Sequence, residues 1–226
     1  MEPDPQVTCW TLIRAAAAGQ AAERDEFSRR YLGPVRAYLT ARWRTTPFLG
    51  DLDDVVQEVF VACFRTGGAL ERATPQAGGF RAFLFGVTRN VALHHERTRA
   101  RRDRRHEPVP ESETLAGDAP TASRAYDQEY ARALLRESAL VMAARAAAGG
   151  AAARRRVELL RLRFEDGLPI REIALRWQCE ALALHREYAK AGREFKAALR
   201  TVVGLSERCP AAALDQECDR LLELLR

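Results

Sequence analysis

The sequence predicts an all-α fold of two small helical domains joined by a flexible linker, followed by an extra C-terminal helix. Apolar residues recur at three- and four-residue spacing along most of the 226 residues, which is the period of an amphipathic helix. Between residues 106 and 126 this period disappears, and proline, glycine, serine and acidic residues take its place. We therefore expect one domain at residues 1–105, the linker at 106–126, a second domain at 127–203 and an extension at 204–226.

Residues 8–44 predict a run of core helices. Trp10, Ile13 and Ala17 share one helical face, and Gly19 is expected to end that helix. An apolar stripe at four-residue spacing follows, and Gly33-Pro34 predicts a break or kink within it. Its members are Phe27, Tyr31, Val35, Leu39 and Trp43. Aromatic stripes of this kind are usually packing, so we expect core positions here.

The central stretch, residues 51–105, predicts two helices with different surfaces. In the first, one stripe is expected to be buried, while Asp54, Gln57, Glu58 and Val61 lie on a face that stays in water. In the second, another apolar stripe is followed by a dense run of arginines. The two stripes are Leu52, Val55, Val56, Val59, Phe60, Cys63 and Phe64, and then Phe80, Phe83, Leu84, Val87 and Val91. Such a pair can hold a protein partner on one side and a polyanion on the other.

The second half of the chain predicts a helix-turn-helix. Helical stripes resume at residue 126, Gly149-Gly150 interrupts them, and Gly167 is expected to end the next helix. Pro169 suits the start of a short helix, a turn follows at 178–180, and a longer helix presents polar residues outward. The expected apolar stripes are Tyr130, Leu134 and Val141; Val157, Leu160 and Phe164; Ile170, Ile173, Ala174 and Trp177; and Leu184, Tyr188, Ala191 and Phe195.

Charge and cysteine usage narrow the functional class. The formal net charge is +5, and all but two of the 36 basic residues are arginine, which favours bidentate contacts with phosphate and guanine. No apolar run reaches the length of a membrane span, and the amino terminus lacks the pattern of a signal peptide. The five cysteines are scattered without a CxxC pair, which indicates reduced thiols in the cytoplasm.

Motifs of catalysis and metal binding do not appear in the sequence. It contains no phosphate-binding glycine loop, no HExxH and no zinc-ligand spacing. His94 and His95 are adjacent, so on a helix their side chains point about 100° apart and do not form a metal pair. We expect no enzyme activity, no cofactor and no metal.

The two helices of residues 51–105 resemble region 2 of the bacterial sigma-70 family, and most of all its small extracytoplasmic-function (ECF) members. The resemblance is carried by DLDDVVQEVF at 51–60 and FRAFLFGVTRNVALHHERTRARR at 80–102. It implies that the first helix docks on the clamp helices of the RNA polymerase beta-prime subunit, through Asp53, Asp54, Gln57, Glu58 and Val61. It implies that the second helix recognises and melts the minus-ten element, through Arg81, Arg89, Asn90, Arg97, Arg101 and Arg102.

The motif GLPIREIALRW at 167–177 resembles region 4 of the same family, which reads the minus-thirty-five element. The resemblance implies that the beta flap of the polymerase is a further partner. Gln178, Glu180 and Ala183 depart from the family pattern, as does His94 after the Arg-Asn pair, so family precedent does not predict the promoter sequence. The residues implied to contact DNA are Arg171, His185, Arg186, Glu187, Lys190 and Arg193.

Three segments leave alternatives open. The loop at 66–79 is a surface connection or, as the resemblance implies, the cap of a pocket for an unstacked promoter base. The acidic linker serves solubility or threads the polymerase cleft. The extension packs back on the second domain, covers the DNA-binding surface or meets a regulator such as an anti-sigma factor. Its apolar face consists of Leu214, Cys218, Leu221, Leu222 and Leu225.

The resemblance as a whole implies a cytoplasmic sigma factor that binds RNA polymerase core, directs promoter-specific initiation and joins the nucleoid when bound to polymerase. The first alternative is an autonomous helix-turn-helix regulator acting as a dimer, which leaves the first domain unexplained. The second is an enzyme acting on nucleic acid, which needs a metal or nucleophile that the sequence does not offer.

Overall fold

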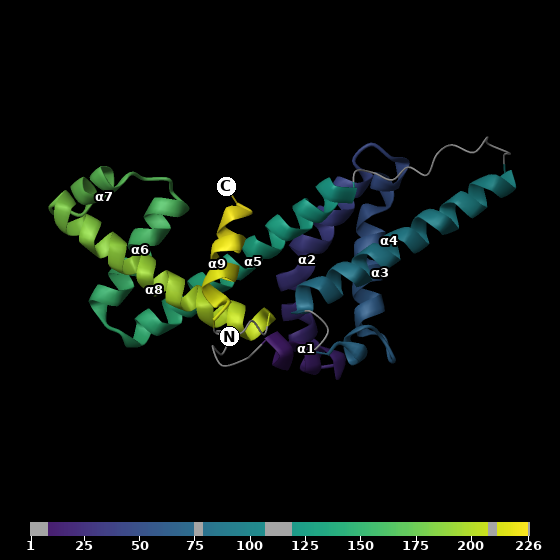
Figure 1. Cartoon of the computed structure of the whole chain (residues 1–226), viewed down its shortest axis with the longest axis horizontal. Helices are drawn as coiled ribbons and strands as arrows, with labels where there is room; N and C mark the ends of the chain where they lie inside the picture. The colour runs from purple at the N-terminus through teal and green to yellow at the C-terminus, as the bar shows by residue number, and fades with distance from the viewer. Residues whose placement is uncertain (1–8, 75–78, 107–118, 208–211, 226) are drawn as a thin grey trace. The chain divides into compact units, whose positions relative to one another are not determined.

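The structure is a computed structural model that describes residues 9–74, 79–106, 119–207 and 212–225. Within these ranges every regular element is helical, which confirms the predicted all-α class (Figure 1). No helix of the described ranges combines the length and the apolarity that crossing a membrane would require. The helices are α1 (Cys9–Ala17), α2 (Ala21–Trp43), α3 (Leu52–Phe64), α4 (Gly79–His106), α5 (Ala119–Ala148), α6 (Ala151–Phe164), α7 (Ile170–Arg176), α8 (Ala181–Glu207) and α9 (Leu214–Glu223), with 3-10 turns η1 (Pro47–Asp51) and η2 (Leu70–Arg72).

The chain divides into two compact units. Of the described residues, the N-terminal unit holds those up to 133 together with 205–207 and 220–225. The C-terminal unit holds 134–204 and 212–219. The division therefore falls within α5, α8 and α9, and each unit is described by itself.

The core of the N-terminal unit is an aromatic cluster at which α2 meets its neighbours. α2 packs against α1, α3 and α4. The Phe80 ring lies 5.0 Å from Tyr31, 5.7 Å from Phe27 and 5.9 Å from Trp10, centroid to centroid. Tilted and edge-to-face pairs at these separations are the favourable arrangements for aromatic rings. Cys63 of α3 is buried in the same unit, and burial raises the pKa of its thiol to about 12.

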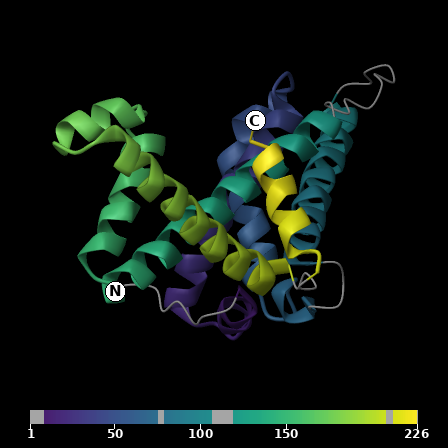
Figure 2. The same cartoon turned by 60° about the vertical axis from the view of Figure 1, so that its left-hand side comes forward.

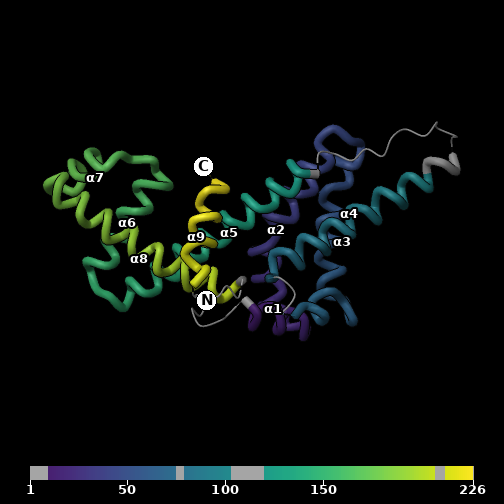
Figure 3. The backbone as a smooth tube through the Cα atoms, in the orientation of Figure 1, coloured from purple at the N-terminus to yellow at the C-terminus, as the bar shows by residue number. Residues whose placement is uncertain are grey.

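The predicted break at Gly33-Pro34 does not end the helix. α2 continues from Ala21 to Trp43 with Pro34 inside it, and Figure 3 traces it as one uninterrupted helix. Proline removes one backbone hydrogen bond of a helix. Tyr31 and Val35 are buried on either side of this position, so the packing of the stripe outweighs the lost bond.

Helix α5 begins at Ala119, inside the segment expected to be a linker. Its residues Tyr126 and Tyr130 are fully buried, with Tyr130 stacked on Tyr31 at 6.2 Å and Tyr126 edge-on to Phe85 at 5.3 Å. The predicted linker was therefore too long at its C-terminal end, because Tyr126, assigned to the linker, and Tyr130, assigned to the second domain, complete the core of the N-terminal unit. The remaining part of that linker, residues 107–118, lies outside the described residues.

The C-terminal unit has two apolar clusters on two sides of α6. Leu159 and Leu162 pack with α7 and the start of α8, whereas Val157 and Leu160 pack against Met142, Ala191 and Ala198. In Figure 2 the view is rotated so that α6, α7 and α8 come toward the viewer. The predicted stripe through Phe164 was wrong at that residue, since its side chain is 72% exposed at the end of α6. Gly149-Gly150 and Gly167 end helices as predicted, and Gly150 and Gly167 adopt positive φ.

Helix α9 is tied to α8 within the C-terminal unit. Lys196 lies 3.3 Å from Asp219 and 3.7 Å from Asp215, and Arg200 also pairs with Asp215. A Leu214 methyl carbon lies 3.5 Å from where a side chain on Gly204 would begin. These contacts attach the first part of the extension to α8, and they leave its contact with DNA or a regulator untested.

Candidate docking and nucleic-acid interfaces

The acidic face predicted on α3 is exposed as a single surface. Asp53, Asp54, Gln57 and Glu58 are all exposed, and Val61 is 56% exposed one turn further on. Val55, Val56, Val59 and Cys63 on the opposite face are buried. The two aspartates also lie in the first turn of the helix, where negative charge is favourable to the helix dipole.

A residue of α2 joins this acidic face. Arg36 pairs with Asp53 at 2.5 Å, with side chains 49% and 79% exposed. Sequence reasoning missed Arg36, because it placed only the buried stripe of α2 and not the neighbour of its outer face. Leu32, one turn earlier in α2, is 42% exposed.

Helix α4 presents a basic stripe on its outer side. Asn90, Arg97 and Arg101 are exposed at intervals of one or two helical turns, while Leu84, Thr88 and Ala92 are buried on the other side. His94 is also exposed and lies between Asn90 and Arg97 in this stripe. The sequence did not predict it as a contact residue. We call this surface the α4 stripe; its exposed members are Arg89, Asn90, His94, Arg97, Arg101 and Arg102.

Arg81, predicted with the minus-ten residues, has a partner within the protein. Its Nε donates to Asp127 Oδ1 at 2.8 Å, and its side chain is 29% exposed. The Tyr126 hydroxyl donates to the Arg81 carbonyl at 3.3 Å. Arg81 therefore fixes α5 to the first turn of α4, apart from the α4 stripe.

A polar cluster joins the start of α3 to the middle of α4. Asp51 shares a hydrogen bond of 3.0 Å with His95 Nε2 and accepts another from Arg99. These two hydrogen bonds hold the pKa of the Asp51 carboxyl below its ordinary value. The Arg99 guanidinium also lies 5.8 Å over the Phe48 ring. The cluster thereby sets the acidic face and the α4 stripe at a fixed separation.

A largely buried ion pair also joins the end of α2 to the middle of α4. Arg42 donates to both carboxylate oxygens of Glu96, at 2.7 and 2.9 Å, and the indole of Trp43 donates to Glu96 at 2.8 Å. Arg42 is only 7% exposed, and its hydrogen bonds to Glu96 raise its pKa, so it stays charged. A bidentate pair of this kind is strong and directional.

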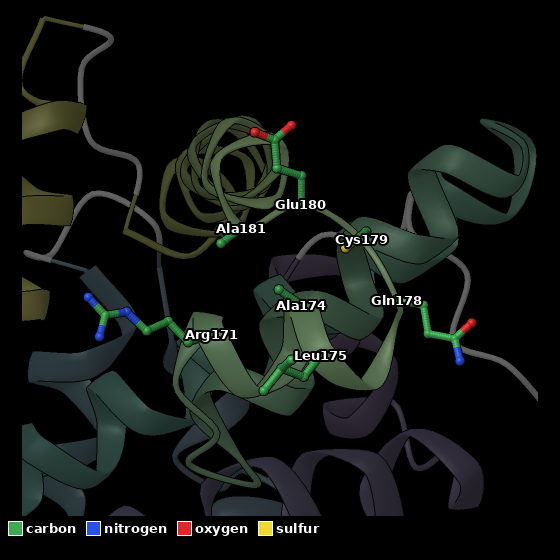
Figure 4. A pocket seen from close by; sticks show the side chains of 7 residues that line it. All are labelled: Arg171, Ala174, Leu175, Gln178, Cys179, Glu180 and Ala181. Carbon is green, nitrogen blue, oxygen red and sulfur yellow. The ribbon is translucent and has the colours of Figure 1, made fainter.

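In the C-terminal unit, α7 and α8 are two helices joined by a tight turn. Gln178 occupies the left-handed region at φ 50°, and the Cys179 amide donates back to the Ala174 carbonyl at 3.0 Å. The turn borders a pocket of about 660 Å³, seen in Figure 4. Arg171, Ala174, Leu175, Gln178, Cys179, Glu180 and Ala181 line it.

The residues predicted to read the minus-thirty-five element lie on the outer side of these helices. Arg171 on α7 and His185, Arg186, Glu187, Lys190 and Arg193 on α8 are all exposed. Two apolar side chains that sequence reasoning missed are exposed beside them, Leu175 at 78% and Leu182 at 58%. Leu175 follows the buried Ala174 and Leu182 follows the partly buried Ala181, so the period alone offered no signal for them.

The described residues contain no group of three or more His, Cys, Asp or Glu side chains placed to hold a metal ion. The exposed charges of the acidic face and the α4 stripe can bind and orient a partner of opposite charge.

Residues 27–102 match the family model of Sigma-70 region 2. This range begins in α2, contains α3 and extends into the basic end of α4, so it includes both the acidic face and the α4 stripe. No curated protein matches the chain.

Proposed function

We propose that the protein is a sigma factor of the ECF type that binds RNA polymerase core and directs promoter-specific initiation. One observation carries the proposal: the segment matched to region 2 exposes an acidic face on α3 and a basic stripe on α4. The ECF assignment rests on the resemblance of residues 51–60 and 80–102. Such a protein acts by binding energy without bond chemistry, in the cytoplasm and at the nucleoid.

In this proposal the acidic face docks on the beta-prime clamp helices. Asp54, Gln57 and Glu58 supply exposed acceptors, and Val61 supplies an apolar contact beside them. Asp53 is already paired with Arg36, so docking must either keep this pair or exchange it. Exposed charges of this kind steer association and select the partner more than they add affinity.

The α4 stripe then engages the promoter at the upstream edge of the melted region. Its arginines neutralise phosphates, and each neutralised phosphate releases counterions, which makes binding strongly salt-dependent. Asn90 is the exposed amide of the stripe and can contact a base edge. The stripe is held at a set distance from the docking face by the Asp51 cluster, so docking on polymerase also places the stripe.

The C-terminal unit anchors the duplex upstream through α7 and α8. The N-terminal residues of the second helix in such a motif reach base edges, and Arg171 at the start of α7 suits a phosphate. Two DNA contacts on one polymerase-bound protein reinforce one another, so neither contact needs high affinity alone. The beta flap and an anti-sigma factor are the further protein partners of this proposal.

The test is binding of the full chain to RNA polymerase core, compared with a Gln57→Ala/Glu58→Arg variant. We expect tight binding by the wild type and its loss in the variant. The matched control is Asp25→Arg, a charge reversal at an exposed residue of α2 outside the acidic face. Loss of binding in the control as well would point to a general charge effect. Absence of binding by the wild type, with duplex affinity retained, would favour the autonomous regulator.

A further inference from the structure

One arginine of α6 is buried against the outer helix of the C-terminal unit. The Arg156 side chain is only 9% exposed, and its Nε donates to Glu194 Oε2 at 2.7 Å while its Nη1 donates to Glu187 Oε2 at 3.2 Å. Both glutamates belong to α8. The hydrogen bond from Arg156 lowers the pKa of Glu194, and the hydrogen bonds to Glu194 and Glu187 raise the pKa of Arg156, so Arg156 and Glu194 stay charged.

Glu187 lies at the edge of the exposed face of α8, on the side that meets α6, and it differs in charge from its exposed neighbours. It is a carboxylate among the exposed cations Arg186, Lys190 and Arg193. Its side chain is 50% exposed, and Arg156 occupies its Oε2, which leaves Oε1 available to a ligand. On a helix that lies in the major groove, a carboxylate oxygen can accept a hydrogen bond from the N4 amino group of cytosine.

A free glutamate is poorly suited to this task. Its side chain has several rotatable bonds, whose ordering costs free energy, and its charge is repelled by DNA phosphates. Arg156 reduces both costs, because it fixes one oxygen and places a positive charge beside the carboxylate. Glu194, the other acid bound to Arg156, is less exposed, at 35%.

We propose that Glu187 is a specificity-determining residue that accepts a hydrogen bond from a cytosine amino group, and that Arg156 is the positioning residue that aims it. The inference deepens the proposed function and rests on it, since it requires α8 to enter a major groove. Arg156 itself does not touch DNA. Its effect on base choice is exerted through Glu187.

The test uses the full chain with RNA polymerase core and a library of duplexes randomised over the upstream promoter segment. The wild type is expected to enrich cytosine at one position, and Glu187→Ala to lose that preference by about tenfold while the other positions keep theirs. Arg156→Lys retains the charge but cannot bind two carboxylates in the same geometry, so we expect it to weaken the same preference. Glu194→Gln should lower the melting temperature and leave base preference unchanged.

The matched control is Arg161→Lys. Arg161 lies on the same helix and pairs with acids near it in sequence, Glu158 and Asp166, so base preference should not change. Circular dichroism of each variant shows that the helices are retained. If Arg156→Lys folds and keeps the full cytosine preference, Arg156 is structural and the proposal is overturned. An unchanged preference in Glu187→Ala overturns it equally. If the wild type enriches no duplex at all, the DNA-reading part of the proposed function fails as well.

Discussion

At the scale of single residues, the N-terminal unit depends on buried or half-buried charged groups that pair with one another. Glu96 is the clearest case, because it accepts two hydrogen bonds from Arg42 and one from Trp43. Removing one partner of such a pair leaves the other charge buried without compensation. The destabilisation caused by removing one partner exceeds the stability that the intact pair adds relative to apolar residues at the same positions.

We therefore expect Glu96→Ala to destabilise the protein by about 3–5 kcal/mol. The matched control is Glu26→Ala, which removes a glutamate paired with Arg29 at the surface, where the side chains are 43% and 73% exposed. The control should cost at most about 1 kcal/mol. Urea unfolding of both variants measures the difference. Equal unfolding midpoints for the two variants would show that the buried pair stabilises the protein no more than the surface pair does.

Asp51 gives a prediction for acid stability. Its pKa is lowered in the folded protein by hydrogen bonds with His95 and Arg99, from an ordinary value of 3.8. A carboxyl with a lowered folded pKa contributes stability that is fully present above the unfolded pKa and is lost as the pH falls through the folded pKa. The contribution of Asp51 should therefore begin to fall near about pH 4 and decrease further as the pH is lowered.

In the variant Asp51→Asn this pH-dependent contribution is absent. We expect the variant to be less stable than the wild type near neutral pH and the gap to narrow in acid. Unfolding midpoints at about pH 6 and about pH 3 measure both effects. A gap that is constant across this range would mean that the carboxylate charge does not stabilise the fold.

At the scale of elements, two helices are longer than the local sequence signals predicted. α2 passes through Pro34, and α5 starts at Ala119 within the expected linker. In both cases buried aromatic residues, Tyr31 in α2 and Tyr126 in α5, hold the element in the core. Propensity is a weak signal, and tertiary packing overrides it when enough apolar surface is buried.

Replacing each of two glycines by alanine is expected to change the stability of the protein in opposite directions. Gly192 lies inside α8, and a side chain added there would meet no atom within 4 Å, so Gly192→Ala should stabilise the protein by about 0.5–1 kcal/mol. At Gly68 an added Cβ would lie 2.4 Å from the Arg65 carbonyl oxygen and 2.9 Å from that of Cys63. These are backbone atoms that cannot move aside cheaply, so Gly68→Ala should destabilise by about 1–3 kcal/mol.

Thermal unfolding followed by circular dichroism measures both glycine variants. The two substitutions are identical in chemistry, so each is the control of the other. Stabilisation by Gly68→Ala, or destabilisation by Gly192→Ala, would contradict the local geometry described for that position.

At the scale of the whole molecule, function depends on where the charge lies more than on its total. The formal net charge is only +5, yet Arg97 and Arg101 of the α4 stripe are exposed one turn apart on the side of the helix away from its buried residues. The acidic face on α3 is exposed beside it. In the proposed function, this separation lets one unit bind a protein and a polyanion through different surfaces.

The salt dependence of DNA binding tests this distribution. Replacing Arg97 and Arg101 by alanine should reduce the slope of log K against log salt by about 1.8, or about 0.9 for each lost phosphate contact on duplex DNA. The control replaces Arg44 and Arg72, which are exposed outside α4, and changes the net charge equally. Titrations of polymerase-bound protein with duplex DNA measure both slopes. The same reduction in the control would mean that the total charge, rather than the stripe, governs affinity.

The sequence by itself determined which residues share a face. The helical period and the residue types placed Val55 and Val59 inside, and Gln57 and Glu58 outside, and they predicted the basic end of α4. These properties follow from geometry within one helix, where a side chain's direction depends only on its position. For the same reason the all-α class and most of the candidate surface residues could be predicted.

Only the tertiary structure decided which face meets which element. Arg81 was expected to contact DNA, and the structure pairs it with Asp127, which lies 46 residues away in the sequence. Arg156 likewise pairs with Glu187, 31 residues away. Tyr126 and Tyr130 joined the N-terminal unit although the fading of the period suggested a boundary before them. The period of a helix carries no information about its neighbours, because those contacts are set by how apolar faces of several helices can be buried together.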